Sequence, residues 1–226
     1  MTDSEESKQE QYGRNRQVEY WDRVSAEAKG FHHPVALPLM NSLASREELV
    51  VELGCGRGRV LALLADNGYS RLSGFDTSPA MIERGGLEHP GLDLRHWSGR
   101  QVPLESGCAS VVMLFAVLTC VPGDDGQCEL IAEASRLLKP GGVLYVSDYF
   151  LQGDERNISR YERYAELHGT YGVFEIEGGV VLRHLSREWF GQLTEGFQRV
   201  SMKEIDLLTM NGNPARAFQY AGRLKN

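Results

Sequence analysis

The chain is organised around one short stretch, residues 50–60, which reads VVELGCGRGRV. Its apolar first half ends in three alternating glycines, Gly54, Gly56 and Gly58. Glycine has no Cβ atom, so such a loop can turn sharply and let its backbone approach a ligand closely. In open α/β sheets, cofactors bind at the carboxyl ends of the strands. The stretch therefore predicts a buried first strand, then a cofactor-binding loop, then a helix.

An acidic residue stands at the end of the next apolar run, residues 72–76, which we predict to be the second strand. There Asp76 borders the same crevice, where one carboxylate can bind two ribose hydroxyls. A lone acidic residue at a strand end is more often a helix cap or solvated, but the glycine loop upstream favours a ligand. A dinucleotide loop has the pattern G-x-G-x-x-G, and here Arg59 occupies the place of the third glycine. The two elements therefore indicate an adenosine cofactor and make NAD the less favoured one.

Outward from this stretch, apolar runs alternate with stretches of helical periodicity, which is typical of βαβ units and a parallel sheet. Further strands are predicted at 92–97, 110–117 and 143–150, and helices at 59–67, 78–84 and 126–138. Gly85-Gly86 is expected to end the second helix, and Pro140-Gly141-Gly142 is expected to form a turn. A helix, a hairpin, another helix and two strands should complete the chain, which predicts a doubly wound α/β fold with a mostly parallel, seven-stranded sheet.

The length and composition of the chain fit one folded unit. With 226 residues and 42% hydrophobic content, the chain can bury the core of a single α/β domain, which we place at 17–226. Residues 1–16 are polar and are expected to form a disordered tail. The segment 151–184 is too long for an ordinary connection of about 2–6 residues. We therefore predict that it is a cap inserted after the fifth strand, covering the substrate.

Charge and cysteine content argue against several kinds of partner. A formal net charge of -7 disfavours nucleic acid, because nucleic-acid binders concentrate Lys and Arg. The four cysteines form no C-x-x-C pair, so we expect neither a metal site nor disulfides, and a cytoplasmic location. No run approaches the roughly 18 apolar residues of a membrane span, so no membrane contact is expected. The sequence does not indicate an oligomeric state.

Four segments resemble the class I S-adenosylmethionine-dependent methyltransferases. They are 52–58, which resembles the first motif of that family, 74–81, which resembles the second, and the later segments 117–121 and 137–144. The resemblance implies a Rossmann-like fold and transfer of a methyl group from S-adenosylmethionine, with S-adenosylhomocysteine released. It also implies a set of cofactor contacts: Glu52, Gly54, Cys55, Gly56, Gly58, Asp76, Thr77, Met81, Ser98, Gly99, Phe115 and Ala116.

Within this set the resemblance assigns roles to individual residues. Glu52 would position the methionine part of the cofactor, Asp76 would hold the ribose, and Met81 would pack near the adenine. Phe115 and Ala116 would line the methionine end. The chain departs from the family at Ser98-Gly99, where an acidic residue often contacts the adenine, and at Ala109-Ser110, which lacks the usual aspartate.

The methyl acceptor is expected to be a small molecule, because the chain has no N/D-P-P-Y/F/W segment and no Pro-Cys nucleophile after the fourth strand. Transfer from a sulfonium mainly requires alignment, so a catalytic base is not obligatory. If one is used, the candidates are Asp148, Tyr149 and His184. Candidates for the acceptor pocket are His33, Tyr171, Phe174, Arg183 and His184.

Two other functions remain open at this point. One is an NAD(P)-dependent oxidoreductase, which Arg59 disfavours. The other is a non-catalytic module that binds S-adenosylmethionine for regulation. Cys55 stands in the loop without a nearby histidine, so we expect it to be structural rather than a nucleophile.

Overall fold

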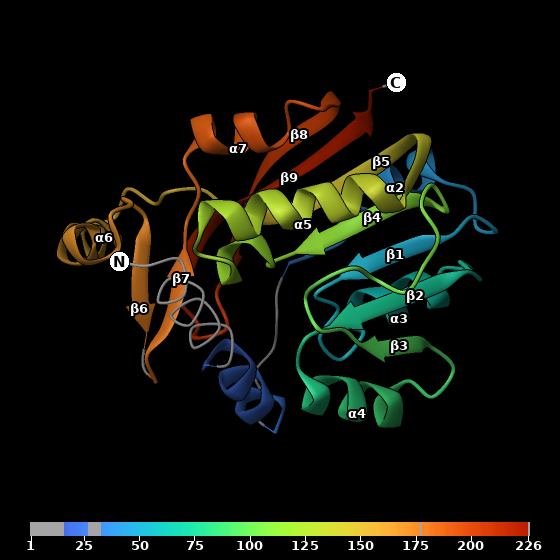
Figure 1. Cartoon of the computed structure of the whole chain (residues 1–226), viewed down its shortest axis with the longest axis horizontal. Helices are drawn as coiled ribbons and strands as arrows, with labels where there is room; N and C mark the ends of the chain where they lie inside the picture. The colour runs from blue at the N-terminus through green and yellow to red at the C-terminus, as the bar shows by residue number, and fades with distance from the viewer. Residues whose placement is uncertain (1–15, 27–32, 177, 226) are drawn as a thin grey trace.

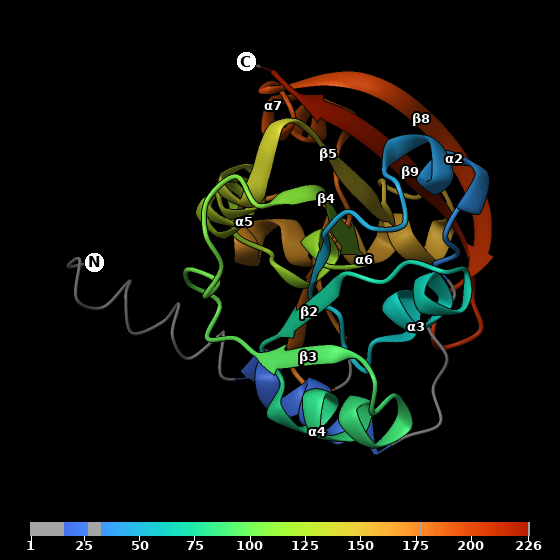
Figure 2. The same cartoon turned by 90° about the vertical axis from the view of Figure 1, so that its right-hand side faces the viewer.

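The computed structural model describes residues 16–26, 33–176 and 178–225 (Figure 1). In this part of the chain seven strands form one sheet in the order β3-β2-β1-β4-β5-β9-β8. The first five strands in this order pair in parallel, and β9 pairs antiparallel with both β5 and β8. Figure 2 shows β3 at one edge of this twisted sheet and β8 at the other. The strand bounds are β1 Val50–Leu53, β2 Leu72–Asp76, β3 Asp93–His96, β4 Ala109–Phe115, β5 Leu138–Tyr149, β8 Phe197–Leu208 and β9 Pro214–Leu224. The predicted doubly wound, mostly parallel fold is confirmed.

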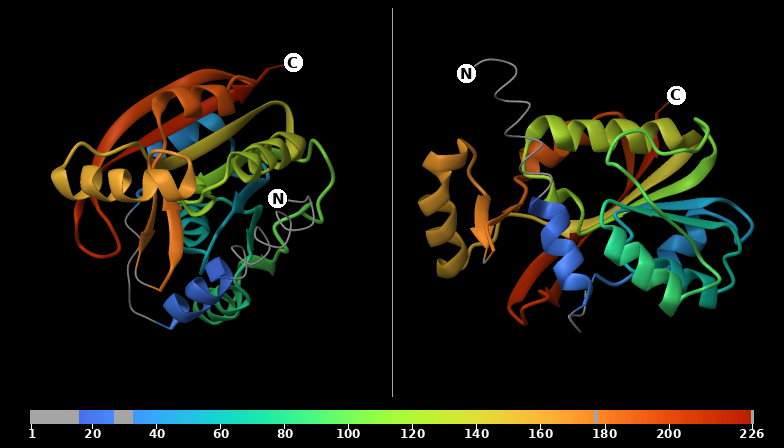
Figure 3. Two further views of the ribbon diagram at one scale, coloured as in Figure 1. Left: turned by 60° about the vertical axis from the view of Figure 1, so that its left-hand side comes forward. Right: turned by 60° about the horizontal axis from the view of Figure 1, so that its bottom comes forward.

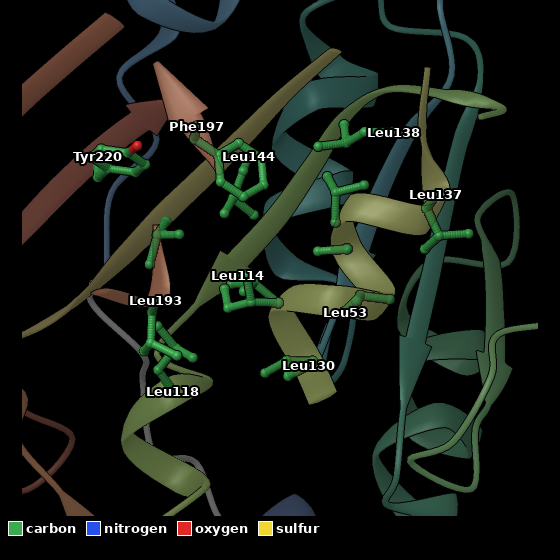
Figure 4. Packing of buried hydrophobic residues seen from close by; sticks show 14 of the residues in the cluster. Leu53, Leu114, Leu118, Leu130, Leu137, Leu138, Leu144, Leu193, Phe197 and Tyr220 are labelled. Atoms are coloured by element: carbon green, nitrogen blue, oxygen red, sulfur yellow. The ribbon is translucent and has the colours of Figure 1, made fainter. Parts of the chain in front are cut away.

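Helices cover both faces of the sheet, so its central strands are buried on both sides. The helices α5 (Asp124–Leu137) and α7 (Arg187–Leu193) pack on one face, and α2 (Leu37–Leu43), α3 (Arg59–Asp66) and α4 (Pro79–Glu88) on the other (Figures 1 and 3). All seven residues of β4 are buried. From Val111 to Phe115 they alternate between the two hydrophobic clusters, with Leu114 facing α5 in Figure 4 and Met113 on the opposite side. This double burial explains why β4 is a continuous apolar run in the sequence.

The second helix does not end at its glycines, so that prediction is wrong. Helix α4 continues through Gly85 and Gly86 to Glu88. Gly85 is buried, and a Cβ atom there would lie 2.8 Å from the carbonyl oxygen of Arg57 and 2.7 Å from Leu94 Cδ1. The glycine therefore lets α4 approach the loop after β1 closely, rather than terminating the helix.

The predicted turn at Pro140-Gly141-Gly142 is instead a bulge inside β5. Ala109 of β4 pairs with Leu138, whereas Val111, two residues on, pairs with Val143. The extra residues of β5 therefore bulge out of the ladder, and Gly141 takes a positive φ of 72° that favours glycine. The strand begins before this segment, which periodicity alone could not indicate.

The segment after β5 folds beside the main sheet. Helix α6 (Glu155–His168) is followed by a separate two-stranded sheet of β6 (Val173–Ile176) and β7 (Val180–Arg183), as the predicted order required. A helix over residues 16–25 lies between this hairpin and α4 (Figure 3). Of the predicted tail, residues 1–15 lie outside the described part of the chain, and Arg16 is helical.

Candidate cofactor and acceptor site

The glycine loop leaves β1 at the carboxyl edge of the sheet in a conformation that requires glycine. Gly54, Gly56 and Gly58 have φ values of 72°, 54° and 80°. A Cβ atom at Gly54 would lie 2.6 Å from Val117 Cγ2, whereas one at Gly56 would meet nothing within 4 Å. At Gly54 the loop therefore packs against the segment after β4. At Gly56 the backbone borders open space, which is part of a cleft.

Asp76 closes this loop from the end of β2. Its Oδ2 accepts a hydrogen bond from the Gly56 amide at 2.7 Å, and its Oδ1 accepts one from the Ser78 amide at 2.9 Å. Burial raises the pKa of Asp76, and the two backbone donors oppose that rise. The carboxylate is therefore held in a fixed position at the border of the cleft, where the resemblance places the ribose.

Glu52 is a buried carboxylate that lines the cleft. Its side chain is 2% exposed, and its Oε2 has no hydrogen-bond partner. Burial raises its pKa well above the usual range, Asp76 adds to the rise, and Arg59 opposes it. A buried carboxylate without a partner is costly unless a ligand supplies a donor. A cationic amino group, such as that of the methionine part of S-adenosylmethionine, fits this place.

The remaining predicted cofactor residues lie around the same cleft. Thr77, Met81, Ser98, Gly99, Phe115 and Ala116 all line it, as do Gly54, Cys55 and Gly56. Ala116 has a φ of 56°, which is rare for a residue with a Cβ atom and marks a strained turn after β4. Gly58 is the exception. It begins α3 and packs against Leu94, 2.9 Å from where its Cβ would be, so it serves packing rather than the cleft.

The cleft is larger than a cofactor alone needs. It measures about 2270 Å³, against roughly 300–1,000 Å³ for a typical pocket for one small ligand. Its further wall contains residues outside the predicted site set, which come from the helix over 16–25 and from the segment 151–184: Gln17, Trp21, Leu167, His168, Thr170, Val173, Glu175, Val180 and Val181. Trp21 lies on the helix over 16–25, and only the tertiary arrangement brings it to the cleft.

Three residues predicted as proton acceptors lie outside the cleft lining. Asp148 is fully buried, accepts hydrogen bonds from the amides of Thr119 and Tyr149, and has its pKa raised by burial to about 7. His184 Nδ1 lies 2.5 Å from the hydroxyl of Tyr161, and burial lowers its pKa to about 3. Tyr149 stacks on His184. These groups join β5 to the cap and do not face the cleft.

The cap residues chosen from the sequence also point elsewhere. Tyr171 is 49% exposed and does not line the cleft. Phe174 is buried under the guanidinium of Arg160, 3.6 Å from its ring centre. Arg183 pairs with Asp124 and donates to the carbonyl of Pro122, which ties β7 to the start of α5. Of the predicted acceptor-pocket residues, His33 alone is part of the cleft lining.

In the described ranges no group of three or more His, Cys, Asp or Glu side chains is placed to hold a metal ion. None of the helices described in the structure is long and apolar enough to cross a bilayer. All four cysteines are free thiols, and burial raises the pKa of Cys55 well above its usual range. A raised pKa keeps that thiol protonated, which agrees with a structural role.

The sheet order, the glycine loop and the two carboxylates define a Rossmann-like methyltransferase fold. A family model described as "Methyltransferase domain" matches residues 51–146. A probable S-adenosylmethionine-dependent methyltransferase of Mycolicibacterium smegmatis is 33% identical over 116 residues, which cover 51% of this chain and 43% of that protein. The chain spans about half the length of the curated relatives it matches, or less.

Solved structures share the fold at low sequence identity. A methyltransferase from Methanosarcina mazei superposes with a TM-score of 0.78 at 20% identity, covering 83% of this chain and 97% of the other. A geranyl diphosphate C-methyltransferase from Streptomyces coelicolor, crystallised with S-adenosylhomocysteine, gives 0.67 at 16% identity, covering 94% and 98%. Residues 51–146 therefore match a methyltransferase domain, and the chain shares the fold of these solved structures.

Proposed function

We propose that the chain transfers a methyl group from S-adenosylmethionine to a small-molecule acceptor and releases S-adenosylhomocysteine. The observation that carries this proposal is Glu52, a buried carboxylate without a partner on Oε2, next to a glycine loop that Asp76 fixes from β2. Such a site fits a ligand that combines an ammonium group with ribose hydroxyls. A nicotinamide dinucleotide has no aliphatic ammonium group, so this pair of carboxylates favours S-adenosylmethionine over NAD(P).

When bound, the cofactor supplies a methyl group already activated by its sulfonium. The task of the protein is then to bind, orient and exclude water. Glu52 would hold the amino group and Asp76 the ribose, while the open backbone at Gly56 admits the cofactor without a steric clash. Phe115 and Ala116 would line the methionine end.

The acceptor would occupy the part of the cleft beyond the cofactor, under the segment 151–184. That part is bordered by Val173, Val180 and Val181 on the hairpin and by Trp21 on the helix over 16–25. Apolar walls with a few polar groups are typical of small-molecule pockets. The net charge of -7 argues against a nucleic-acid acceptor, and four free thiols suit the reducing cytoplasm.

Calorimetry followed by a product assay tests the proposal. S-adenosylmethionine and S-adenosylhomocysteine should bind the full chain, whereas NAD and NADP should bind at least tenfold more weakly. The chain is then incubated with methyl-labelled S-adenosylmethionine and a small-molecule metabolite extract, and label should move to a low-mass product. Binding without any turnover would instead support a non-catalytic, cofactor-binding module, and preferential binding of NAD(P) would overturn the cofactor assignment.

A further inference from the structure

One imidazole is built into the cleft wall by contacts from several elements. His33 is 2% exposed and lines the cleft. Its Nδ1 lies 2.9 Å from the hydroxyl of Ser147 on β5. Its ring stands edge-on to Tyr149, with 4.7 Å between ring centroids and 88° between the ring planes. The side chain is therefore oriented at two points before any ligand binds.

The backbone around His33 is fixed to the cofactor side of the sheet. Arg59, at the start of α3, donates to the carbonyl of His33 at 2.7 Å. Gln219 of β9 donates to the carbonyl of Pro34. These bonds tie the segment to the helix that follows the glycine loop and to the neighbouring strand, so the imidazole and the loop share one rigid support.

Ser147 connects this imidazole to Ala116, which the resemblance assigns to the methionine end of the cofactor site. Its hydroxyl contacts His33, while its carbonyl accepts a hydrogen bond of 2.8 Å from the amide of Ala116. Ala116 is the strained residue that lines the cleft, and the resemblance assigns it to the methionine end of the cofactor. Ser147 of β5 therefore holds His33 beside the residue assigned to the methionine end, whose sulfur carries the methyl group.

The other described histidines of the cleft lie elsewhere. His96 ends β3 opposite Asp76, where the ribose would bind, and His89 follows the end of α4. His168 stands 3.4 Å from Glu175 on the cap. Asp148, Tyr149 and His184 do not line the cleft at all.

We propose that His33 is a catalytic residue that accepts the proton of an O–H or N–H acceptor during methyl transfer, with Ser147 as its positioning residue. This inference rests on the proposed function. The acceptor heteroatom forms a bond to the methyl carbon, and the carbon–sulfur bond breaks with its electron pair remaining on sulfur. The acceptor proton moves to Nε2 of His33 and later to solvent. For this role the neutral ring must be protonated on Nδ1, and this N–H must donate a hydrogen bond to the hydroxyl oxygen of Ser147.

Nitrogen NMR of the full chain, with ¹⁵N-labelled histidine, tests the tautomer without an acceptor. Neutral His33 should carry its proton on Nδ1 and gain a second one on Nε2 as the pH falls. Ser147→Ala removes the group to which Nδ1–H donates, so it should raise the fraction of the neutral ring that is protonated on Nε2. A neutral ring protonated on Nε2 in the wild type would overturn the proposal. Among the described residues, Tyr149 of β5 packs against the ring, and Arg59 of α3, which interacts with Glu52 of β1, binds the carbonyl of His33.

Methyl transfer to a panel of phenols, primary amines and carboxylic acids tests the catalytic role. His33→Gln should lower kcat at least tenfold and remove the acidic limb of the pH profile of kcat. His33→Asn keeps the contact to Ser147 but has no nitrogen in the place of Nε2, so it should be equally slow. Added imidazole should restore part of the rate to His33→Ala. Affinity for S-adenosylhomocysteine should stay within threefold in each variant, which separates failure of the base from failure of the cofactor site. Unchanged pH profiles, or turnover of carboxylic acids only, would overturn the role, because a carboxylate has no proton to lose.

Discussion

The carboxylate of Asp76 and the backbone amide of Gly56 are joined by a hydrogen bond of 2.7 Å, although they come from different strand ends. The bond spans the carboxyl edges of β2 and β1, which pair in parallel. It makes the glycine loop and the carboxylate proposed to bind the ribose one unit. A change at Asp76 should therefore affect both the ligand contact and the shape of the loop.

Asp76→Ala should weaken binding of S-adenosylhomocysteine by tenfold or more. Charge-assisted hydrogen bonds contribute about 1.5–3 kcal/mol, and here the loop also loses its anchor at Gly56. Titration calorimetry measures the change. Asp66→Ala is the matched control, because Asp66 is exposed at the end of α3 and should leave the affinity unaltered. Wild-type affinity in Asp76→Ala would refute the ribose assignment.

Glu52→Gln should separate stability from binding. The pKa of Glu52 is raised in the folded chain, so its contribution to stability is complete below the ordinary value of 4.5 and is lost as the pH rises through the raised pKa. Without ligand, the variant should therefore be at least as stable as the wild type at pH 8. It should also lose most of the thermal stabilisation that S-adenosylhomocysteine gives, because an amide cannot pair with an ammonium ion.

Thermal unfolding at several pH values, with and without S-adenosylhomocysteine, provides both readouts for Glu52. Asp76 and Asp148 also have raised pKa values, so they also change the stability of both proteins with pH. The effect of Glu52 is therefore read from the difference in melting temperature between the wild type and the variant at each pH. A variant that gains the full stabilisation from the ligand would show that Glu52 does not contact the amino group.

The three glycines of the loop should respond differently to alanine. At Gly54 a Cβ atom would clash with Val117, so Gly54→Ala should lower the free energy of unfolding. At Gly56 space is open, so Gly56→Ala should fold at a cost of roughly 1–2 kcal/mol for its positive φ, yet lose cofactor binding. Gly86→Ala, in an open position of α4, is the control and should raise stability by about 0.5–1 kcal/mol. Chemical denaturation measures the changes in stability, and calorimetry measures cofactor binding. If Gly56→Ala binds the cofactor like the wild type, the loop is a structural turn and does not contact the cofactor closely.

The sequence could predict the cofactor side of the site because its signals are local. Alternating glycines and an acidic strand end each depend on a few consecutive residues, and parallel pairing brings both to one edge. At Gly58 the absence of a side chain allows close packing on Leu94, and spacing cannot distinguish this use from contact with a cofactor. Gly85 gave the same ambiguity, since a helix tolerates glycine where another segment must approach.

The acceptor side depends on which face of the cap meets the sheet, and no local pattern encodes that. Phe174 and His184 were chosen as polar or aromatic residues of the cap, but they form its interior with Tyr161. The residues that line the cleft, such as Val181, are ordinary strand residues in the sequence. Only the docking of the hairpin beside the helix over 16–25 exposes them to the cleft.

Asp148→Asn should change the pH dependence of stability. The pKa of Asp148 rises from 3.8 to about 7 on folding, so its contribution to stability is present below pH 3.8 and is lost as the pH rises through 7. Relative to Asp148→Asn, the wild type should lose stability between about pH 4 and pH 7. Urea denaturation at intervals across this range measures the difference. Parallel curves for the two proteins would contradict the raised pKa.

Val181→Trp should impair use of the acceptor without affecting the cofactor. Val181 lines the cleft from β7, and its carbonyl accepts a hydrogen bond from Gln17 that holds the hairpin to the helix over 16–25. A large ring there would fill the space proposed for the acceptor, so KM for the acceptor identified by the product assay should rise by tenfold or more. Affinity for S-adenosylhomocysteine should stay within twofold, because Val181 lies on the cap rather than on the glycine loop.

Tyr171→Ala is the matched control, since Tyr171 belongs to the same cap but is 49% exposed and lies outside the cleft lining, so its kcat and KM should not change. If Tyr171→Ala raised KM while Val181→Trp did not, the acceptor would have to bind on the outer face of the cap.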